Sequence, residues 1–281
     1  MKKALISLNL SQKLVFFFSA ILFIVSIVTL AQFIHSTQNI KSARLGNVET
    51  YTIQLNKAIA AQFYERYGDV QAFAQNEVFF GKNKKLMTET LNNYATLYGI
   101  YNLILFIDTE GRLIAVNDKS PEKNKIDVSG LFNVNFKNEA WFIQAIKEQY
   151  TKDTAKGFDG SVFVPLISDD LIKDVYKQDI KSSLFAAPVK DHNGQIIGVI
   201  CNRAHSKWFE SEIANLKQEL QQQNWISGSI KVVGPSADYA LTSIGNEPDN
   251  LDNEDDYITS KIQIKENKFI RTQLVFANQS P

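Results

Sequence analysis

Residues 14–34 form a long apolar stretch that reads LVFFFSAILFIVSIVTLAQFI. No charged residue, glycine or proline interrupts residues 14–31. A helix rises about 1.5 Å per residue, so about 20 such residues cross the roughly 30 Å hydrocarbon core of a membrane. Because the backbone must satisfy its own hydrogen bonds inside lipid, this pattern predicts a transmembrane helix.

The residues that flank this helix predict its orientation. Three lysines precede it: Lys2, Lys3 and Lys13. A positive flank favours a cytoplasmic N-terminus, so we expect the chain after residue 35 to lie outside the cytoplasm. A cleaved signal peptide is the alternative, with Thr29 and Ala31 as the small residues before the cleavage site. The stretch is longer than the roughly 7–15 apolar residues of a signal core, which favours an uncleaved anchor.

Residues 35–80 contain no proline, and their apolar side chains recur in steps of three and four. These side chains are Val48, Tyr51, Leu55, Ala58, Ile59, Phe63, Tyr67, Val70 and Phe73. The periodicity predicts one long helix with an apolar face. This face can pack along its own domain. We also expect the membrane-proximal part, residues 35–60, to pair with a second copy and form a homodimer.

Two strand–turn–strand units follow at residues 101–116 (YNLILFID, TEG, RLIAV) and 182–204 (SSLFAAPVKD, HNG, QIIGVICNRA). In the first unit, Gly111 supplies a turn residue that tolerates positive φ. In the second unit, Asn-Gly between two apolar runs is a strong hairpin signal. A further strand, SVFVPLI, is predicted at residues 161–167.

Three helices are predicted around these strands, at residues 84–98, 138–150 and 206–223, because apolar residues recur there at helical spacing. Hairpins bounded by helices predict an α+β fold, in which helices flank an antiparallel sheet. The short connections do not suit a parallel βαβ series, which needs a long crossover between strands.

A weaker pattern begins at residue 225. It predicts a hairpin at residues 229–243 with its turn at Gly234-Pro235, an acidic loop at 247–257 and two strands within 260–277. This unit is roughly 55 residues long, which is short for an independent domain.

The composition excludes several classes of function. Lys+Arg and Asp+Glu number 30 each, so no basic excess exists that would displace counterions from nucleic-acid phosphates. Cys201 is the only cysteine, so no intrachain disulfide forms. Three histidines and the lack of CxxC, HExxH, GxSxG and GxxxxGKS patterns argue against a metal site or a catalytic triad. We therefore expect no enzyme activity, no cofactor and no nucleic-acid partner.

The order of these parts resembles one family. The parts are the apolar anchor, a long helix with YERYGDVQAFA, the hairpin LILFIDTEGRLIAVND, the helix AWFIQAI and the hairpin FAAPVKDHNGQIIGVICNRA. Together they resemble the double Cache sensor domain, over residues 14–230. The pattern APVxDxxGxxxGV at residues 187–199 is the most specific part of the resemblance.

The resemblance implies the extracytoplasmic sensing region of a bacterial receptor in the inner (plasma) membrane, with a single span and a periplasmic or extracellular domain. A chemotaxis receptor is the first expectation, and a sensor histidine kinase or a diguanylate cyclase is the alternative. The family's fold is a long helix that carries two PAS-like modules, of which the membrane-distal one usually binds the ligand. The implied division is a cytoplasmic N-terminus (1–13), a transmembrane helix (14–34), a long helix (35–80), a membrane-distal PAS-like Cache module (81–224) and a partial membrane-proximal module (225–281).

The chain departs from the family in one respect. The family's receptors have a second membrane helix and a cytoplasmic output module, whereas no second run of 18 apolar residues and no output module is recognisable here. We therefore expect a receptor fragment or a truncated gene product. A membrane-tethered protein that binds a solute for a transporter is a second functional class, because it needs no second membrane helix. An extracytoplasmic hydrolase ranks last, because no nucleophile–base–orienter set is visible.

Four aromatic residues lie on or beside the elements that line the family's distal pocket: Tyr101, Trp141, Phe142 and Phe163. Aromatic residues on such elements fill cores more often than they touch ligands. Trp141 is the strongest single candidate for a ligand contact, because its indole N–H requires a partner when it is buried.

Two charged positions complete the candidate site that the resemblance implies. In amine-sensing relatives a helix arginine two residues before the tryptophan holds the ligand carboxylate, and an aspartate on the last strand holds the amino group. The matching residues are Glu139 and Arg203, with Asn202 beside the latter, so the charges are exchanged. The two form an ion pair that closes the pocket, or flank an open pocket in which Arg203 binds a carboxylate, or face solvent at the rim. We expect a small ligand, a carboxylate or an amine.

Overall fold

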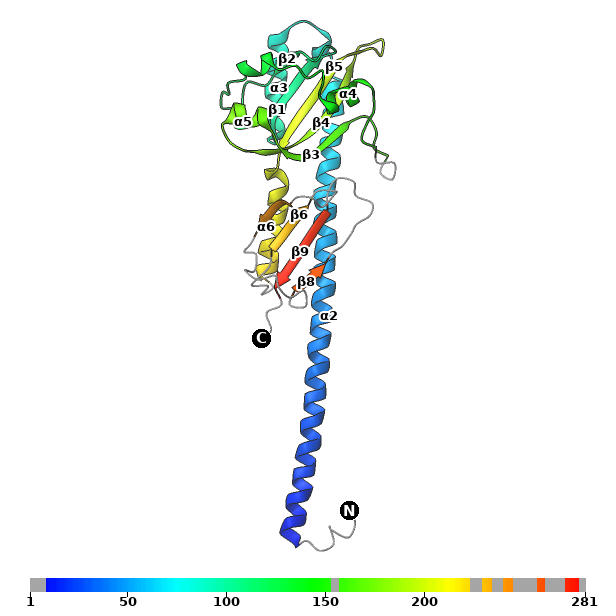
Figure 1. Ribbon diagram of the computed structural model, residues 1–281, viewed down its shortest axis with the longest axis vertical. Coiled ribbons are helices and arrows are strands. Elements are labelled where there is room, and N and C mark those ends of the chain that lie inside the picture. The colour runs from blue at the N-terminus through cyan, green and yellow to red at the C-terminus, as the bar shows by residue number, and fades with distance from the viewer. Residues whose placement is uncertain are drawn as a thin grey trace. The chain divides into compact units, whose positions relative to one another are not determined.

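The computed structural model describes residues 9–152, 157–222, 229–233, 240–244, 257–260 and 271–277 (Figure 1). The chain divides into two compact units, residues 1–50 and 51–281. One helix, α2 (Leu10–Ala74), begins in the first unit and ends in the second. The long helix predicted from the sequence is therefore present, and it ends at Ala74, just before the short 3-10 helix η1 (Glu77–Phe80).

The first unit holds one helix that is long and apolar enough to cross a membrane, Leu10–Ile40, with a mean hydropathy of 2.8. Its most apolar window contains no buried residue, so its apolar side chains face outward. Its hydroxyl groups donate to carbonyl oxygens of the preceding turn: Ser26 Oγ lies 2.8 Å from the Leu22 oxygen, and Thr29 Oγ1 lies 3.0 Å from the Val25 oxygen. Polar groups satisfied within the helix and apolar groups on its surface suit a lipid environment.

The second unit contains a five-stranded sheet with the strand order β2-β1-β5-β4-β3, in which every neighbouring pair is antiparallel. The strands are β1 (Tyr101–Asp108), β2 (Leu113–Val116), β3 (Val162–Ser168), β4 (Lys181–Lys190) and β5 (Ile196–His205). Both hairpins and the α+β class predicted from the sequence are confirmed.

Four helices accompany this sheet: α3 (Lys84–Tyr98), α4 (Ala140–Ile146), α5 (Asp170–Tyr176) and α6 (Lys207–Gln222). Helix α3 has the predicted bounds, because Asn83 caps its N-terminus and Gly99, in the left-handed region, caps its C-terminus. Helix α4 is shorter than the predicted residues 138–150, and Glu148 just beyond it has a φ of 54°. Helix α5 was not predicted.

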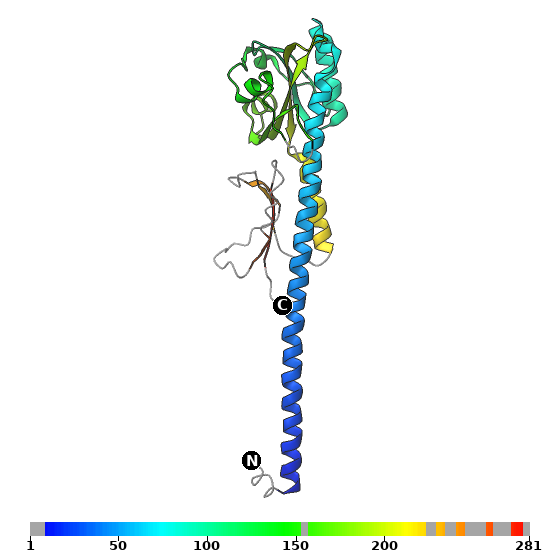
Figure 2. The same cartoon turned by 90° about the vertical axis from the view of Figure 1, so that its right-hand side faces the viewer.

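Helices α2 and α3 cover one face of the sheet, and α4 and α5 cover the other (Figure 2). On α2 the buried residues follow the predicted stripe: Leu55, Ile59, Phe63, Tyr67, Val70 and Phe73. Aromatic rings join this stripe to the sheet, with 5.8 Å between the ring centroids of Phe73 and Tyr101 and 5.4 Å between those of Phe63 and Phe163. This part of the helix therefore packs along its own domain, which is one of the two roles expected for it.

A second sheet lies in the C-terminal part of the chain, with the strand order β7-β6-β9-β8. Its strands are β6 (Ser229–Val233), β7 (Ala240–Ile244), β8 (Tyr257–Ser260) and β9 (Arg271–Ala277), all paired antiparallel. The predicted pairing of β6 with β7 is confirmed. The predicted turn at Gly234-Pro235 and residues 247–256 of the predicted acidic loop lie outside the described residues, whereas Tyr257, the last residue of that predicted loop, belongs to β8.

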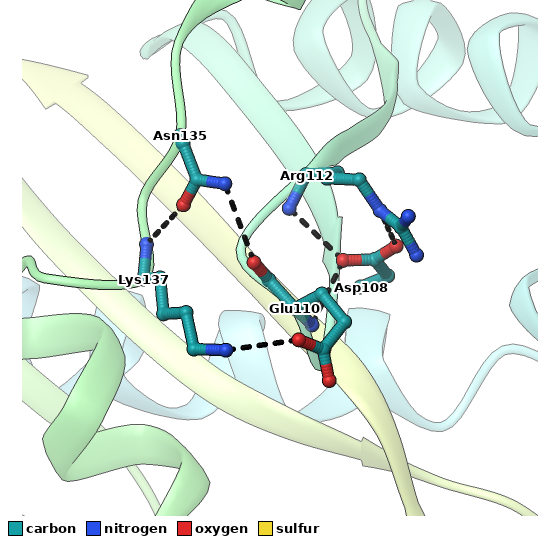
Figure 3. A network of polar contacts seen from close by, with 5 residues as sticks. All are labelled: Asp108, Glu110, Arg112, Asn135 and Lys137. Carbon is teal, nitrogen blue, oxygen red and sulfur yellow. Dashed lines mark hydrogen bonds and ion pairs between the residues drawn. The ribbon is translucent and has the colours of Figure 1, made fainter.

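The turn between β1 and β2 is tied to the segment that leads into α4 (Figure 3). Asp108 Oδ1 accepts hydrogen bonds from the backbone N–H groups of Glu110 and Arg112, both at 2.9 Å. Lys137 Nζ lies 2.9 Å from Glu110 Oε2, and Asn135 Oδ1 accepts from the Lys137 N–H at 2.8 Å. Exposed ion pairs contribute little to stability, so the main effect of this network is to position the chain before α4.

Gly111, at the centre of this network, is a position where only glycine fits. Its φ is +81°, and a Cβ would lie 2.4 Å from the backbone nitrogen of Lys137. Gly194, in the turn between β4 and β5, has a similar φ of +78°, but a Cβ added there would meet open space. We predict that Gly194→Ala lowers the free energy of unfolding by about 1 kcal/mol and Gly111→Ala by about 3 kcal/mol, since only the latter adds a steric clash.

Urea denaturation of the two variants, followed by circular dichroism, measures this difference. Gly194→Ala is the matched control for the backbone conformation. Equal losses of stability in the two variants would show that the close approach of residues 111 and 137 does not affect the free energy of unfolding.

Candidate ligand-binding layer

The layer between the sheet and helices α4 and α5 contains a buried ion pair among aromatic and aliphatic side chains. We term it the binding layer, because it is the candidate ligand site. Helix α4 places two aromatic side chains in it, Trp141 and Phe142, and both are buried. Their ring centroids lie 6.0 Å apart at an interplanar angle of 90°, an edge-to-face arrangement that aromatic rings prefer. The layer is otherwise lined by aliphatic side chains of β1, β4 and β5, among them Leu103, Leu184 and Val199.

Arg203 is the positive charge of the binding layer. It lies on β5, opposite Leu103 of β1 and Leu184 of β4. Its guanidinium carbon lies 5.9 Å from the centroid of the Trp141 ring, which is a cation–π distance. Only 7% of its side chain is exposed, and its Nη1 donates to Oδ2 of Asp169.

Asp169 is the negative charge of the layer, and 3% of its side chain is exposed. It caps the N-terminus of α5, where its Oδ1 accepts from the N–H groups of Leu171 at 3.1 Å and Ile172 at 3.4 Å. Its Oδ2 accepts from Ser182 Oγ at 3.0 Å and from Arg203. Four donors therefore hold this carboxylate in one orientation.

Two further observations describe the polar surroundings of Arg203. Its Nε is buried and has no hydrogen-bond partner among the described residues. Burial raises the pKa of the Cys201 thiol to about 12, although the charge of Arg203 acts in the opposite direction. Cys201 is therefore a neutral thiol at physiological pH. Arg203 and Asp169 form the ion pair described inside the layer.

A surface cavity of about 630 Å³ borders the layer, lined by Asp118, residues 125–129 and Phe132. Val128 in its wall also belongs to the hydrophobic core that contains Trp141 and Phe142. The cavity therefore opens beside the binding layer, on the connection between β2 and α4. Among the described residues, no group of three or more His, Cys, Asp or Glu side chains is placed to hold a metal ion.

Several solved structures of other proteins share this architecture. No known protein family and no curated protein matches the sequence. Among solved structures, the sensor domain of the V. cholerae histidine kinase DctB is similar at a TM-score of 0.56 and 13% identity, over 85% of this chain and 99% of that one. The Campylobacter jejuni chemoreceptor Tlp3 ligand-binding domain with L-valine gives 0.53 at 10% identity, over 85% and 94%.

A third structure is the ligand-binding domain of the Pseudomonas aeruginosa amino acid chemoreceptor PctC with GABA, with a TM-score of 0.51 at 13% identity, over 80% of this chain and 95% of that one. The chain has the double Cache fold. The resemblance seen in the sequence is thereby confirmed at the level of the fold. Identities this low show the fold alone, so the chemistry of the site has to be derived from the residues of this chain.

Within this double Cache fold, the candidate site residues separate onto the two faces of the sheet. Trp141, Phe142 and Arg203 come together in the binding layer. Glu139 is the N-cap residue of α4, with an exposed side chain that makes no capping hydrogen bond. The ion pair of Arg203 is formed with Asp169 instead of with Glu139.

Tyr101, Phe163 and Asn202 lie on the other face, toward α2. Asn202 is adjacent to Arg203 along β5, and successive residues of a strand point to opposite faces. Phe163 pairs with Phe185 and contacts α2. The register of β1 shifts between Tyr101 and Leu103, so a bulge turns Tyr101 away from the binding layer.

Tyr101 joins the sheet to α2 through a buried polar contact. Its hydroxyl donates to Oδ2 of Asp69 at 2.6 Å. Burial raises the pKa of Tyr101 well above its ordinary value, and the adjacent Asp69 charge acts in the same direction. Burial also raises the pKa of Asp69, against the hydrogen bond from Tyr101. The phenol therefore stays a neutral donor, and its role in this structure is to hold β1 on the helix.

Neither Asp169 as a site residue nor helix α5 was predicted from the sequence. The signal was present, because Ser168-Asp169-Asp170 precedes the apolar pair Leu171-Ile172, and an aspartate before an apolar helical start is a typical N-cap. The pairing with Arg203 spans 34 positions and has no signature in the spacing.

We predict an asymmetric response to breaking this ion pair. Asp169→Ala leaves Arg203 charged and buried and removes the cap of α5, and should cost about 3–5 kcal/mol of unfolding free energy. Arg203→Met should cost only about 1–2 kcal/mol, because Asp169 keeps three other hydrogen-bond donors. The double variant Asp169→Ala, Arg203→Met should cost less than the sum of the two single variants.

A double-mutant cycle by urea denaturation gives all three values and their coupling. Purely additive effects would contradict the claim that each charge depends on the other.

Proposed function

We propose that this chain is the ligand-sensing region of a membrane-anchored bacterial signal-transduction receptor, and that the receptor is a chemotaxis receptor. One observation carries the proposal: a double Cache fold is built on the same uninterrupted helix that begins as an apolar, outward-facing segment. An apolar anchor and a sensor fold on one helix suit a protein that detects a molecule outside the cytoplasm and reports across the membrane. The similar structures are ligand-binding sensor domains, which supports a non-enzymatic role.

The binding layer is the proposed place of the ligand. Trp141 and Phe142 supply an apolar wall, and Arg203 supplies a hydrogen-bond donor beneath it. Glu139, at the start of α4, is the proposed charged residue of the rim. Tyr101 and Phe163 contact α2, so their positions favour a role in joining the sheet to this helix over direct contact with a ligand. Asn202 lies on the same face of the sheet.

The same unit offers a path from this layer to α2. The connection between α4 and β3 is hydrogen-bonded to one turn of the helix: Tyr67 Oη donates to the Thr151 carbonyl oxygen at 2.6 Å and accepts from the Ser161 N–H at 3.1 Å. Ser161 Oγ also donates to the Tyr67 carbonyl oxygen at 2.8 Å. A ligand that binds two arrangements of this connection with different affinity would bias the position of α2.

The membrane arrangement follows from α2. We propose a single-pass protein of the inner membrane, with residues 1–13 in the cytoplasm and the sensing domain in the periplasm or outside the cell. Residues 35–60 are the proposed contact between two copies of the chain, since Ile40 lies 53% exposed on the helix and Leu55 is the first buried residue of the stripe among the residues whose burial is described.

A histidine kinase is the second candidate for the whole receptor, because the similar structure with a TM-score of 0.56 is a histidine kinase sensor domain. Both receptor classes place the same sensing event outside the membrane, so the two candidates differ in the output module and not in the binding layer.

The function is tested by ligand binding. A thermal-shift screen of the purified chain in detergent, against L-amino acids, small carboxylates, amines and amides, should give at least one compound that raises Tm in proportion to its concentration. Trp141→Phe should weaken the binding of that compound by about tenfold, because the smaller ring leaves a gap beside the Arg203 guanidinium.

Trp208→Phe is the matched control, because Trp208 lies on α6 and its ring centroid is 4.9 Å from that of Phe63, on the opposite side of the sheet from the binding layer. It should leave the affinity unchanged. A screen without any hit, or equal losses of affinity in the two variants, would contradict ligand binding in this layer.

The orientation is tested with reporters fused after Pro281. Alkaline phosphatase, which is active only outside the cytoplasm, should be active there, and β-galactosidase should be inactive. Replacing Lys2, Lys3 and Lys13 with glutamate should reduce the phosphatase activity, because it removes the positive flank that sets the orientation. A cytoplasmic location of the intact fusion would overturn the scheme.

A further inference from the structure

The charge inside the binding layer is already balanced. Arg203 and Asp169 are the ionised pair described there, and both side chains are more than nine-tenths buried. The sum of their charges is zero. A buried charge is tolerated when it is paired, so any ionised ligand would add an unpaired charge to a layer that has none.

Asp169 is held too firmly to make room for a ligand anion. Its Oδ1 accepts from the N–H groups of Leu171 and Ile172, and its Oδ2 accepts from Ser182 and Arg203. A ligand carboxylate that replaced it on Arg203 would leave two N–H groups of α5 and one hydroxyl without their acceptor. A ligand amine gains little here either, because the lone pairs of Asp169 already have donors and Arg203 repels a cation.

One polar atom of the pair is nevertheless unused. Arg203 Nε is buried and has no hydrogen-bond partner among the described residues, while Nη1 points at Asp169. The two atoms lie on different edges of the planar guanidinium, so an acceptor at Nε does not compete with Asp169. The Trp141 ring lies beside the guanidinium, with its centroid 5.9 Å from the guanidinium carbon. A buried donor without an acceptor is unfavourable, and a ligand oxygen at this edge would satisfy it.

We propose that Arg203 Nε is a ligand contact and that Asp169 determines the charge class of the ligand. The ligand of this layer is an uncharged polar molecule that presents a carbonyl or amide oxygen to Nε and an apolar group to Trp141 and Phe142. Asp169 selects against carboxylates because it already supplies the negative charge that pairs with Arg203. This inference rests on the proposed sensing function and narrows the ligand chemistry of the same site.

The test uses isosteric pairs that differ in charge: acetamide with acetate, propionamide with propionate, and benzamide with benzoate. Saturation-transfer NMR on the purified full chain at pH 7 measures their affinities, with propylamine as the cation. In the wild type, at least one amide should bind about tenfold more tightly than its carboxylate, and propylamine should not bind. A preference for the carboxylate, or no binding by any amide, would overturn the proposal without needing a variant.

Asp169→Asn should reverse the preference. Asparagine also caps helices, so α5 keeps its N-cap, while the carboxylates gain about tenfold in affinity because Arg203 loses its charged partner. Ser182→Ala is the matched control, since it removes a donor to the same Oδ2 without changing charge, and the amide preference should remain. Arg203→Met should abolish the binding of both members of each pair.

The outcomes separate this inference from the proposed function. If Asp169→Asn folds, as judged by circular dichroism, and keeps the preference of the wild type, Asp169 does not set the charge class. If the thermal-shift screen yields a ligand that depends on Trp141 and the amides do not bind, the sensing function stands and the assignment of Nε fails.

Discussion

The apolar stripe of α2 packs on one face of the five-stranded sheet, and most of this structure depends on that contact. A sheet buried on both faces needs two covering layers, and α2 with α3 supplies one of them through Phe63, Tyr67 and Phe73. The other face is covered by two short helices, α4 and α5, with β3 between them in the chain. The buried side chains of α2 thereby hold the sheet on the helix. The layer under α4 and α5 contains the buried ion pair.

Successive side chains of β5 point to opposite faces of the sheet, so neighbouring residues of this strand serve the two layers. Asn202 faces the α2 side and Arg203 faces the binding layer. On the α2 side the polar contacts are hydrogen bonds to the helix, such as that of Tyr101 with Asp69, and they act by fixing positions. On the other side the main polar contact is the buried charge pair of Arg203 with Asp169. Among the described residues, buried polar atoms without a hydrogen-bond partner occur on both faces, at Arg203 Nε and at the Asn202 amide.

Local signals predicted the elements well. The Asn-Gly turn defined the β4–β5 hairpin, and the caps at Asn83 and Gly99 explain why α3 has the predicted bounds. The stripe from Leu55 to Phe73 was visible because a helix repeats its buried positions every three to four residues. The full length of α4 was overestimated, because apolar spacing continues past Glu148 while the backbone there turns to positive φ.

The candidate site was only partly predictable. Trp141, Phe142 and Arg203 do gather in one layer, but the bulge that reverses Tyr101 depends on its pairing with β5 and has no local signature. The partner of Arg203 lies 34 residues away, at the N-cap of a helix that was not predicted, whereas the resemblance to amine-sensing relatives pointed to Glu139. Contacts between distant segments are set by the fold, and sequence patterns describe them poorly.

The pair formed by Asp169 and Arg203 also limits which substitutions this layer tolerates. Loss of the Asp169 side chain leaves the Arg203 guanidinium buried without its partner and α5 without its cap, so this single change is costly in stability. Asp169→Asn removes the negative charge and keeps a capping side chain, so it changes the charge pattern at a lower cost in stability than Asp169→Ala.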